Sequence, residues 1–307
     1  MNFTNIPNTI RQLFVVGVWL AITSAGMNRA GVNADDGGIE LDIPFATVSG
    51  NQGESDTVLS LDFYPSGRAE PSPLIVWVHG GAWRRGDKSS VPIKPLTEKG
   101  FAIASLNYRL SESARFPAQA YDLKAGIRFM RAGAQRFQID PNRIVIAGAS
   151  AGGHLAALVG VSDRVNALED LAMGNADVSS GVSAIVSLYG ASNLETILGQ
   201  STPHGLGVRE PALKLLLGDL PPQVPALAKL ASPITHVDSG DPPLLLIHGD
   251  QDPQMPINQS HELTGAYERA GLDVTFQVLH GVAHGGPAFY SDQQLKQMSD
   301  WIWDKLK

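Results

Sequence analysis

The stretch RIVIAGASAGGHLAAL, residues 143–158, places a single serine, Ser150, among small residues at the end of an apolar run. The run predicts a strand buried on both faces, and the residues after Gly152 favour a helix. The Gly-x-Ser-x-Gly pattern between them is typical of a sharp strand-to-helix turn that exposes the serine oxygen, with glycines relieving the crowding. A Gly- and Ala-rich packing corner can have the same composition. The rest of the chain must therefore decide the function.

Similar apolar runs predict an α/β fold with a mostly parallel sheet. Near-continuous apolar segments typical of strands covered on both faces lie at residues 73–78, 101–106, 143–147, 183–188 and 243–247. Residues 39–49 and 56–65 alternate apolar and polar side chains, which predicts antiparallel strands at one edge, and residues 274–279 form a more mixed last strand. Strands that alternate with helices imply right-handed crossovers, and ligands then bind beyond the carboxyl ends of the strands.

One helix is predicted over residues 117–137, with Pro117 in its first turn. Its expected apolar face consists of Ala118, Tyr121, Leu123, Ile127 and Met130. The interval 191–241 separates two core strands and contains short helical fragments among Pro and Gly turns, so we expect a small cap over the strand ends.

The segment His79-Gly80-Gly81-Ala82-Trp83 follows the strand at 73–78. Consecutive glycines after a strand can turn backbone N–H groups toward a substrate, so Gly80 and Gly81, with Ala151 beyond the serine, are candidate oxyanion-hole donors. His79 is expected to brace this loop rather than to transfer protons. Trp83 is either a core residue or a wall of the substrate pocket, which Ala82 would also line.

Two more segments supply the partners that a serine nucleophile needs. A serine hydroxyl requires an imidazole to accept its proton, and the imidazole requires a carboxylate to orient it. Asp250 and Asp252 follow the strand at 243–247, and His280 and His284 follow the strand at 274–279. The chain order Ser, Asp, His is that of the α/β-hydrolase arrangement. We favour Asp252 and His284 because they lie further out in their loops, and we expect Asp250 to tie its loop down through backbone amides.

Competing interpretations of these residues are weaker. The His280 and His284 spacing suits a metal site on a helix, but Gly281 and Gly285 disfavour a helix and no third ligand is evident. A calcium loop at Asp250 lacks its later ligands, and no Walker-type lysine follows the Gly-rich turn. His154 is expected to be packed and hydrogen-bonded. The sequence implies no metal and no organic cofactor, and the absence of cysteine excludes disulfides and thiolate chemistry.

Charge and the first residues bear on partners and location. The 307-residue chain has a net charge of −7, which argues against a nucleic-acid partner because such proteins need a concentrated basic face. Its one basic group, Arg84, Arg85 and Lys88, is expected to be solvated.

An apolar run after Arg11, followed by small residues, predicts a leader over residues 1–34, cut after Ala25 or Ala34. The remaining alternative is an uncleaved anchor, the only membrane association suggested. We therefore expect a secreted or periplasmic protein with one domain over residues 35–307. Its oligomeric state is not predicted.

Taken together, these segments resemble the α/β-hydrolase superfamily. The resemblance is closest to exported esterases related to hormone-sensitive lipase and to the bifunctional feruloyl and acetyl-xylan esterases, the BD-FAE-like group. It is carried by the following stretches: VWVHGGAWRRGDKS, ASLNYRLS, FPAQAYDLKAGIRFMR, IDPNRIVIAGASAGGHLAAL, ASPITHV, LLLIHGDQDPQMPI and GVAHGG. They run from about Pro73 to His284, in the expected order.

The resemblance implies Ser150 as nucleophile, Asp252 as acid and His284 as base, with Gly80, Gly81 and Ala151 as oxyanion donors. Ala82 replaces a glycine common in the family, and Met255 stands where valine is usual. The implied activity is an exported serine esterase that acts through an acyl-enzyme on short-chain, acetyl or feruloyl esters, either small molecules or linked to carbohydrate. The alternatives are an arylformamidase or peptidase-like amide hydrolase on the same triad, and a hydrolase-like binding protein without turnover.

Overall fold

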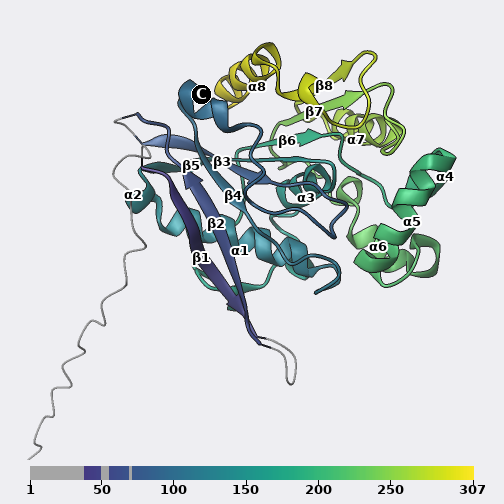
Figure 1. Cartoon of the computed structure of the whole chain (residues 1–307), viewed down its shortest axis with the longest axis horizontal. Helices are drawn as coiled ribbons and strands as arrows, with labels where there is room; N and C mark the ends of the chain where they lie inside the picture. Colours follow the sequence, from purple (N-terminus) through teal and green to yellow (C-terminus); the bar gives the residue numbers. More distant parts are fainter. Residues whose placement is uncertain (1–37, 50–54, 69–70) are drawn as a thin grey trace, which may run out of the picture. The chain divides into compact units, whose positions relative to one another are not determined.

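A computed structural model of the chain describes residues 38–49, 55–68 and 71–307 (Figure 1). The leader predicted over residues 1–34, with its two cleavage points, lies outside the described residues. Among the residues that are described, no helix is both long and apolar enough to cross a membrane.

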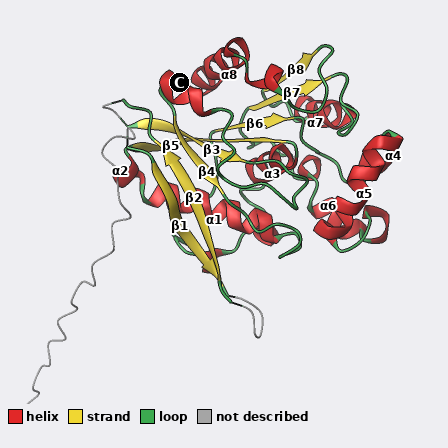
Figure 2. Ribbon diagram, in the orientation of Figure 1, coloured by secondary structure: helices red, strands yellow, loops and turns green. Residues whose placement is uncertain are grey.

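The described chain contains a sheet of eight strands flanked by helices (Figures 1 and 2). The strands are β1 (Glu40–Val48), β2 (Thr57–Tyr64), β3 (Ser72–Val78), β4 (Ala102–Leu106), β5 (Ile139–Ala149), β6 (Ala184–Leu188), β7 (Leu244–Gly249) and β8 (Val274–Leu279). The helices are α1 (Ala118–Ala132), α2 (Ala134–Phe137), α3 (Ala151–Gly160), α4 (Ile197–Gln200), α5 (Pro203–Leu217), α6 (Pro225–Leu230), α7 (Asn258–Arg269) and α8 (Asp292–Lys305).

The strand order is β1-β2-β4-β3-β5-β6-β7-β8. The pairs β1/β2 and β2/β4 are antiparallel, and every other pair is parallel. Strands β3, β4, β5, β6 and β7 correspond to the predicted buried runs, and β8 is the partly buried edge strand. The predicted α/β fold with a mostly parallel sheet is therefore confirmed.

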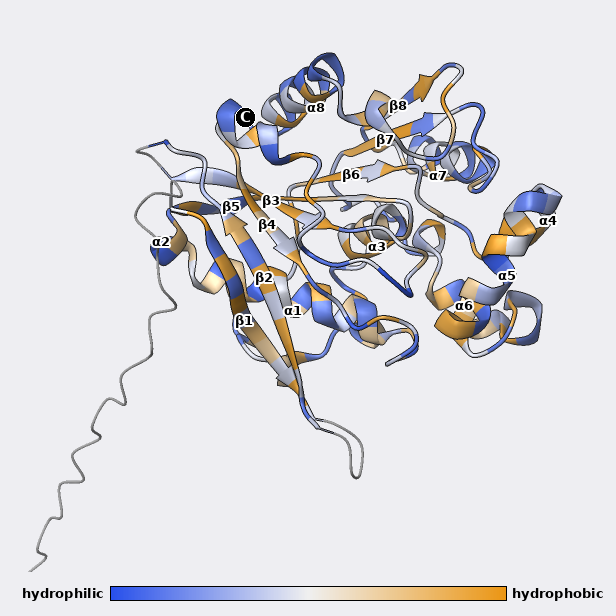
Figure 3. Cartoon of the chain, in the orientation of Figure 1, coloured by the Kyte–Doolittle hydropathy of each residue, from blue (hydrophilic) through white to orange (hydrophobic). Residues whose placement is uncertain are grey.

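Alternation of side chains along the central strands produces two apolar cores, one on each face of the sheet. In β3, Leu74, Val76 and Val78 belong to the core that includes residues of α1, α3 and α7. Ile75 and Trp77 belong to the other core, which α8 covers. Figure 3 shows the central strands as mostly apolar. Because both faces are covered, the carboxyl ends of the parallel strands are the places where side chains can meet a ligand.

The helix predicted over residues 117–137 differs in detail. Its first helical residue is Ala118, so Pro117 precedes the helix, and Gly133 separates α1 from α2. Tyr121 is only half-buried, and its hydroxyl donates to the carbonyl of Ala167 at 3.1 Å. The apolar pattern located the helix correctly, but it could not show that a tyrosine on that face would reach a neighbouring loop.

Residues 191–241 leave the sheet after β6 and return at β7. They contain α4, α5 and α6, which cluster at the right of Figure 1, away from β1 and β2. Of the helical fragments predicted in this interval, residues 225–233 contain α6, and residues 215–218 correspond only to the end of α5. This helix contains Gly205, Gly207 and Pro211, which are poor helix formers, so its length of 15 residues was not predictable from propensity.

Candidate active site

The predicted strand-to-helix turn lies between β5 and α3, with Ser150 at its tip. Ser150 has φ +56° and ψ −118°, a strained backbone for a residue with a side chain, and its N–H donates to Leu188 O at 2.9 Å. A Cβ on Gly148 would lie 2.3 Å from Gly152 O, and a Cβ on Gly152 would lie 2.1 Å from Val78 O. Both flanking positions therefore require glycine, because α3 packs directly on the ends of β3 and β5.

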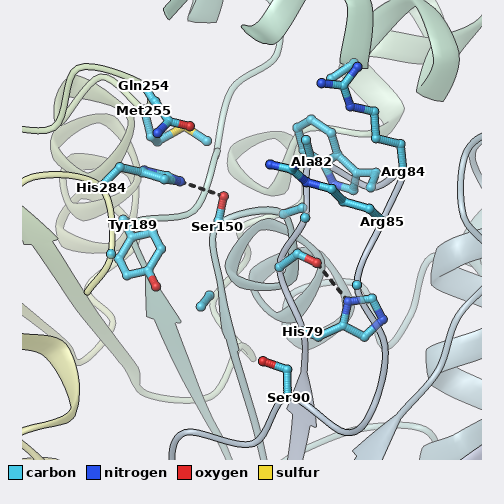
Figure 4. Close-up of a pocket in the computed structure, with 18 of the residues that line it drawn as sticks. His79, Ala82, Arg84, Arg85, Ser90, Ser150, Tyr189, Gln254, Met255 and His284 are labelled. Carbon is cyan, nitrogen blue, oxygen red and sulfur yellow. Dashed lines mark hydrogen bonds between the residues drawn. The ribbon is translucent and has the colours of Figure 1, made fainter. Parts of the chain in front are cut away.

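Three side chains from separate loops meet at this turn. Ser150 Oγ lies 2.9 Å from His284 Nε2, and His284 Nδ1 lies 2.6 Å from Asp252 Oδ2. The Asp252 side chain has no exposed surface and that of His284 is 14% exposed. Figure 4 shows the imidazole directed at the serine oxygen. This geometry allows Ser150 O–H to donate to His284 and His284 Nδ1–H to donate to Asp252.

Asp252 also accepts hydrogen bonds from groups other than His284. Its Oδ1 accepts the amides of Gln254 and Met255, each at 2.8 Å. His248 Nε2 lies 3.0 Å from Met255 O and 3.3 Å from Asp252 Oδ2, so one N–H is shared between two acceptors. Burial alone would raise the pKa of Asp252, but hydrogen bonds from His248, His284 and the Met255 amide hold it well below its usual range. Asp252 is therefore a buried carboxylate that stays ionised.

A second aspartate–histidine pair lies beside the first. His280 Nδ1 is 2.8 Å from Asp250 Oδ2, and the Gly281 amide donates to Asp250 Oδ1 at 2.8 Å. The His280 side chain is 84% exposed. The hydrogen bond from His280, followed by that from Gly281, lowers the pKa of Asp250. As expected, Asp250 ties its loop to a backbone amide, and neither residue of this pair contacts Ser150.

The predicted oxyanion residues lie in two segments that converge on Ser150. Gly81 has φ +113°, and a Cβ there would lie 2.0 Å from Arg85 O, so this position requires glycine. In the described part of the chain, the amides of Gly81 and Ala151 donate to no other backbone group. Ala82 has φ +53°, where a glycine would fit without strain. Gly80, Gly81, Ala82 and Ala151 all line the pocket above Ser150.

His79 has the bracing contacts expected of it. Its Nδ1 lies 2.8 Å from Gly80 O, its ring stacks on Tyr108 at 4.5 Å, and its carbonyl accepts from the Tyr108 hydroxyl at 3.1 Å. Burial is the main cause that lowers the pKa of His79. This side chain therefore holds the loop through neutral contacts.

Trp83 belongs both to the core and to the pocket wall. Its Nε1–H donates to His154 Nδ1 at 3.1 Å, and His154 Nε2–H donates to Ala231 O at 2.7 Å. Burial lowers the pKa of His154 to about 4, so this histidine is neutral near pH 7. His154, packed and hydrogen-bonded as expected, connects the glycine loop, α3 and the segment after α6.

These elements enclose a pocket of about 590 Å³ at the carboxyl ends of the strands (Figure 4). The sequence analysis did not identify three residues of the site. Tyr189 and Arg209 line the pocket, and His248 contacts Asp252. Tyr189 follows β6, and its ring meets the His284 imidazole edge-on at 4.8 Å. His248 and Tyr189 end parallel strands, and that position alone could have identified them. Arg209 lies in the part of α5 that was not predicted.

One prediction about the basic group was wrong. Lys88 is not solvated: its side chain is 11% exposed, and Nζ lies 2.7 Å from both Asp42 Oδ1 and Asp62 Oδ1. The ion pairs join the glycine-loop segment to β1 and β2. Arg85 is exposed, as predicted, Arg84 is half-buried, and both line the pocket.

The chain is similar to known esterases. The BD-FAE family profile matches residues 61–267. Esterase LipC of Mycobacterium tuberculosis is 31% identical over 220 residues, which cover 70% of this chain and 53% of LipC. Isoprenylcysteine alpha-carbonyl methylesterase ICME of Arabidopsis thaliana is 30% identical over 239 residues, 73% of this chain and 53% of the relative. The chain thus spans about half the length of these curated relatives.

Solved structures show the same fold over most of the chain. A truncated carbohydrate esterase from gut microbiota superimposes with a TM-score of 0.78 at 32% identity, covering 89% of this chain and 98% of that one. An acetyl ester-xyloside bifunctional hydrolase from Caldicellulosiruptor lactoaceticus superimposes with a TM-score of 0.70 at 26% identity, covering 86% and 95%.

Proposed function

The chain belongs to the BD-FAE family of α/β-hydrolase esterases, and we propose on this premise that it is a carboxylic ester hydrolase that works through an acyl-enzyme on Ser150. The observation that carries the proposal is the hydrogen-bonded line from Ser150 Oγ through His284 to buried Asp252. The resemblance of the chain to esterases over most of its length supports the same reaction class.

In the proposed acylation, Ser150 Oγ attacks the ester carbonyl carbon while His284 Nε2 accepts the hydroxyl proton. The carbonyl oxygen becomes negatively charged, and amides of Gly80, Gly81 and Ala151 stabilise it. The tetrahedral intermediate then collapses, the carbon–oxygen bond to the alcohol breaks, and His284 returns the proton to the departing alkoxide. Asp252 stabilises the imidazolium that exists between these steps.

Deacylation repeats the sequence with water. His284 removes a proton from the water that attacks the acyl carbonyl, and it then protonates Ser150 Oγ as the acid leaves. In both steps His284 must be neutral when it accepts a proton.

For substrate, we propose short-chain acyl, acetyl or feruloyl esters, including esters carried by carbohydrate. The similarity to a carbohydrate esterase and to an acetyl ester-xyloside hydrolase supports this choice. The apolar run after Arg11 supports export, which N-terminal sequencing of the mature protein would test.

The direct test is hydrolysis of p-nitrophenyl acetate by the wild type and by Ser150→Ala. The variant should lose at least about 10⁴-fold in kcat, because the nucleophile is removed, while its circular dichroism and melting temperature stay near those of the wild type. Undiminished turnover in a folded Ser150→Ala variant would overturn the proposal. Faster cleavage of N-formylkynurenine or a dipeptide amide than of simple esters would instead favour an amide hydrolase on the same triad.

A further inference from the structure

The pocket above Ser150 has an uneven charge. Its charged lining residues in the described chain are Arg84, Arg85 and Arg209, and no aspartate or glutamate lines it. This contrasts with the net charge of −7 on the whole chain. Figure 4 shows Arg84 and Arg85 across Ser150 from His284. A cavity with cationic walls in an acidic protein favours an anionic ligand, because low-dielectric walls concentrate the field.

Arg209 is the most informative of the three arginines. It lies on α5 and is only 4% exposed. Within the described chain its Nε has no hydrogen-bond partner, and the polar contact of its Nη1 is the sulfur of Met255 at 3.4 Å. A guanidinium offers five N–H donors, and a thioether is a weak acceptor. The charge of Asp252 favours the charged form of Arg209, but Asp252 makes no hydrogen bond to Nε. A buried guanidinium N–H without an acceptor is costly, which indicates that a ligand supplies the missing acceptor.

The contact with Met255 places Arg209 on one side of the reacting centre. Met255 lies beside His284 in Figure 4, and its amide donates to Asp252. In the proposed reaction His284 protonates the departing alcohol, so the alcohol part of the ester must lie on the side of His284. Arg209 is therefore positioned to meet the alcohol part rather than the acyl part.

We propose that the preferred substrates are esters whose alcohol part carries a carboxylate, such as esters of hydroxy acids or acidic sugars, and that Arg209 binds this carboxylate. The inference rests on the proposed esterase function and adds a substrate class to it. A planar guanidinium can bind a carboxylate through two parallel hydrogen bonds. Burial lowers the pKa of Arg209 to about 10, which leaves it charged at neutral pH. The cap helix α5 would thus contribute specificity, while the sheet supplies the proposed reacting groups.

The test compares 4-acetoxybenzoate with 4-acetoxybenzamide, which release the same acyl group and differ in the charge of the alcohol part. Each kcat/KM is divided by the rate of hydroxide-catalysed hydrolysis to remove differences in leaving-group reactivity. The wild type should prefer the carboxylate by about tenfold or more, the effect of a hydrogen bond to a charged group. The preference should change little as salt is added, because a buried charge such as that of Arg209 is screened much less than an exposed one.

Variants then assign the preference to one residue. Arg209→Gln should abolish the preference for 4-acetoxybenzoate, so that the two normalised kcat/KM values become equal. Arg209→Lys should retain part of the preference because the charge remains. Arg164→Gln is the matched control: this arginine is exposed, pairs with Asp238 and does not line the pocket, so the wild-type ratio should persist. The wild-type ratio and its salt dependence test the proposal even if Arg209→Gln does not fold.

The possible outcomes distinguish a failure of the proposed carboxylate preference from a failure of the proposed esterase function. Equal hydrolysis of both probes by the wild type, or an unchanged ratio in folded Arg209→Gln, would overturn the carboxylate preference and leave the esterase proposal intact. A carboxylate preference seen only with 4-nitrophenyl hemisuccinate, which carries the charge in its acyl part, would contradict the assignment to the alcohol side. Hydrolysis of none of these esters would overturn the esterase proposal as well.

Discussion

Two aspartate–histidine pairs follow the same two strands, β7 and β8, and differ in their surroundings. Asp252 and His284 are separated by 2.6 Å, and Asp250 and His280 by 2.8 Å, so distance alone hardly distinguishes them. The Asp252 side chain is fully buried, whereas 29% of the Asp250 side chain is exposed. Interactions between charged groups at the surface are weakened by solvent and salt, and interactions between buried groups are weakened much less. Burial and the contact with Ser150 distinguish Asp252 and His284, the inner pair that we propose to be reactive, from Asp250 and His280, the outer pair that ties down its loop.

The largest effect should come from His284→Gln. Without the imidazole, no group accepts the Ser150 proton, and kcat for p-nitrophenyl acetate should fall by about 10⁴-fold or more. His280→Gln is the matched substitution in the outer pair and should leave kcat within about twofold, since surface changes of this kind have small effects. Equal losses in the two variants would contradict the distinction between the pairs.

Asp252→Asn should have the next largest effect on turnover. The amide no longer stabilises the imidazolium or fixes its tautomer, so kcat should fall by about 10³- to 10⁴-fold with an unchanged fold. Steady-state kinetics beside a thermal melt would measure both quantities. A loss of activity that merely follows a loss of folded protein would show that Asp252 acts only structurally.

His154 provides a third case, a buried histidine with no carboxylate partner. Its pKa is lowered from 6.5 to about 4 in the folded state, so the unfolded chain binds more protons between these values. The contribution of His154 to the free energy of unfolding should therefore be constant above about pH 6.5 and fall as the pH decreases toward 4, by at most ~3 kcal/mol. Urea unfolding of wild type and His154→Gln across this range is the measurement. The variant should show a flatter pH dependence, and an identical one would refute the assignment.

The smallest effect should come from Asp250→Asn. An amide oxygen can still accept the Gly281 N–H, and the outer pair does not reach Ser150. The kcat of the variant should therefore stay within about twofold of that of the wild type, as for other surface substitutions. A loss of more than tenfold in kcat would show that the outer pair participates in turnover.

The strands and the nucleophile turn were predictable from sequence because local patterns determine them. Buried strands have continuous apolar runs, and Gly148 and Gly152 are needed wherever α3 packs so closely on the sheet. The sequence also predicted that Asp252 rather than Asp250 lies beside His284, because two extra residues move a side chain further along its loop. In these regions the residues that form the sequence pattern are the same residues that make the packing contacts.

Other features depend on contacts that no local pattern encodes. Lys88 looked like a surface lysine because its partners, Asp42 and Asp62, are more than 20 residues away in the chain. Arg209 lies on a helix whose glycines and proline disfavour helical structure, so neither its burial nor its place in the pocket could be anticipated. The ion pairs of Lys88 and the position of Arg209 in the pocket were therefore the parts that required the structure.

We propose Ser150 as the nucleophile and the inner pair, Asp252 and His284, as the groups that activate it. The most direct measurement is the rate at which a fluorophosphonate probe labels wild type, Asp252→Asn and Asp250→Asn, with the modified residue identified by peptide mass spectrometry. We expect labelling at Ser150 in all three proteins, at a rate lowered by about 10²-fold or more in Asp252→Asn and within about twofold of wild type in Asp250→Asn. Labelling at another residue, no labelling of the wild type, or equal slowing in the two variants would contradict it.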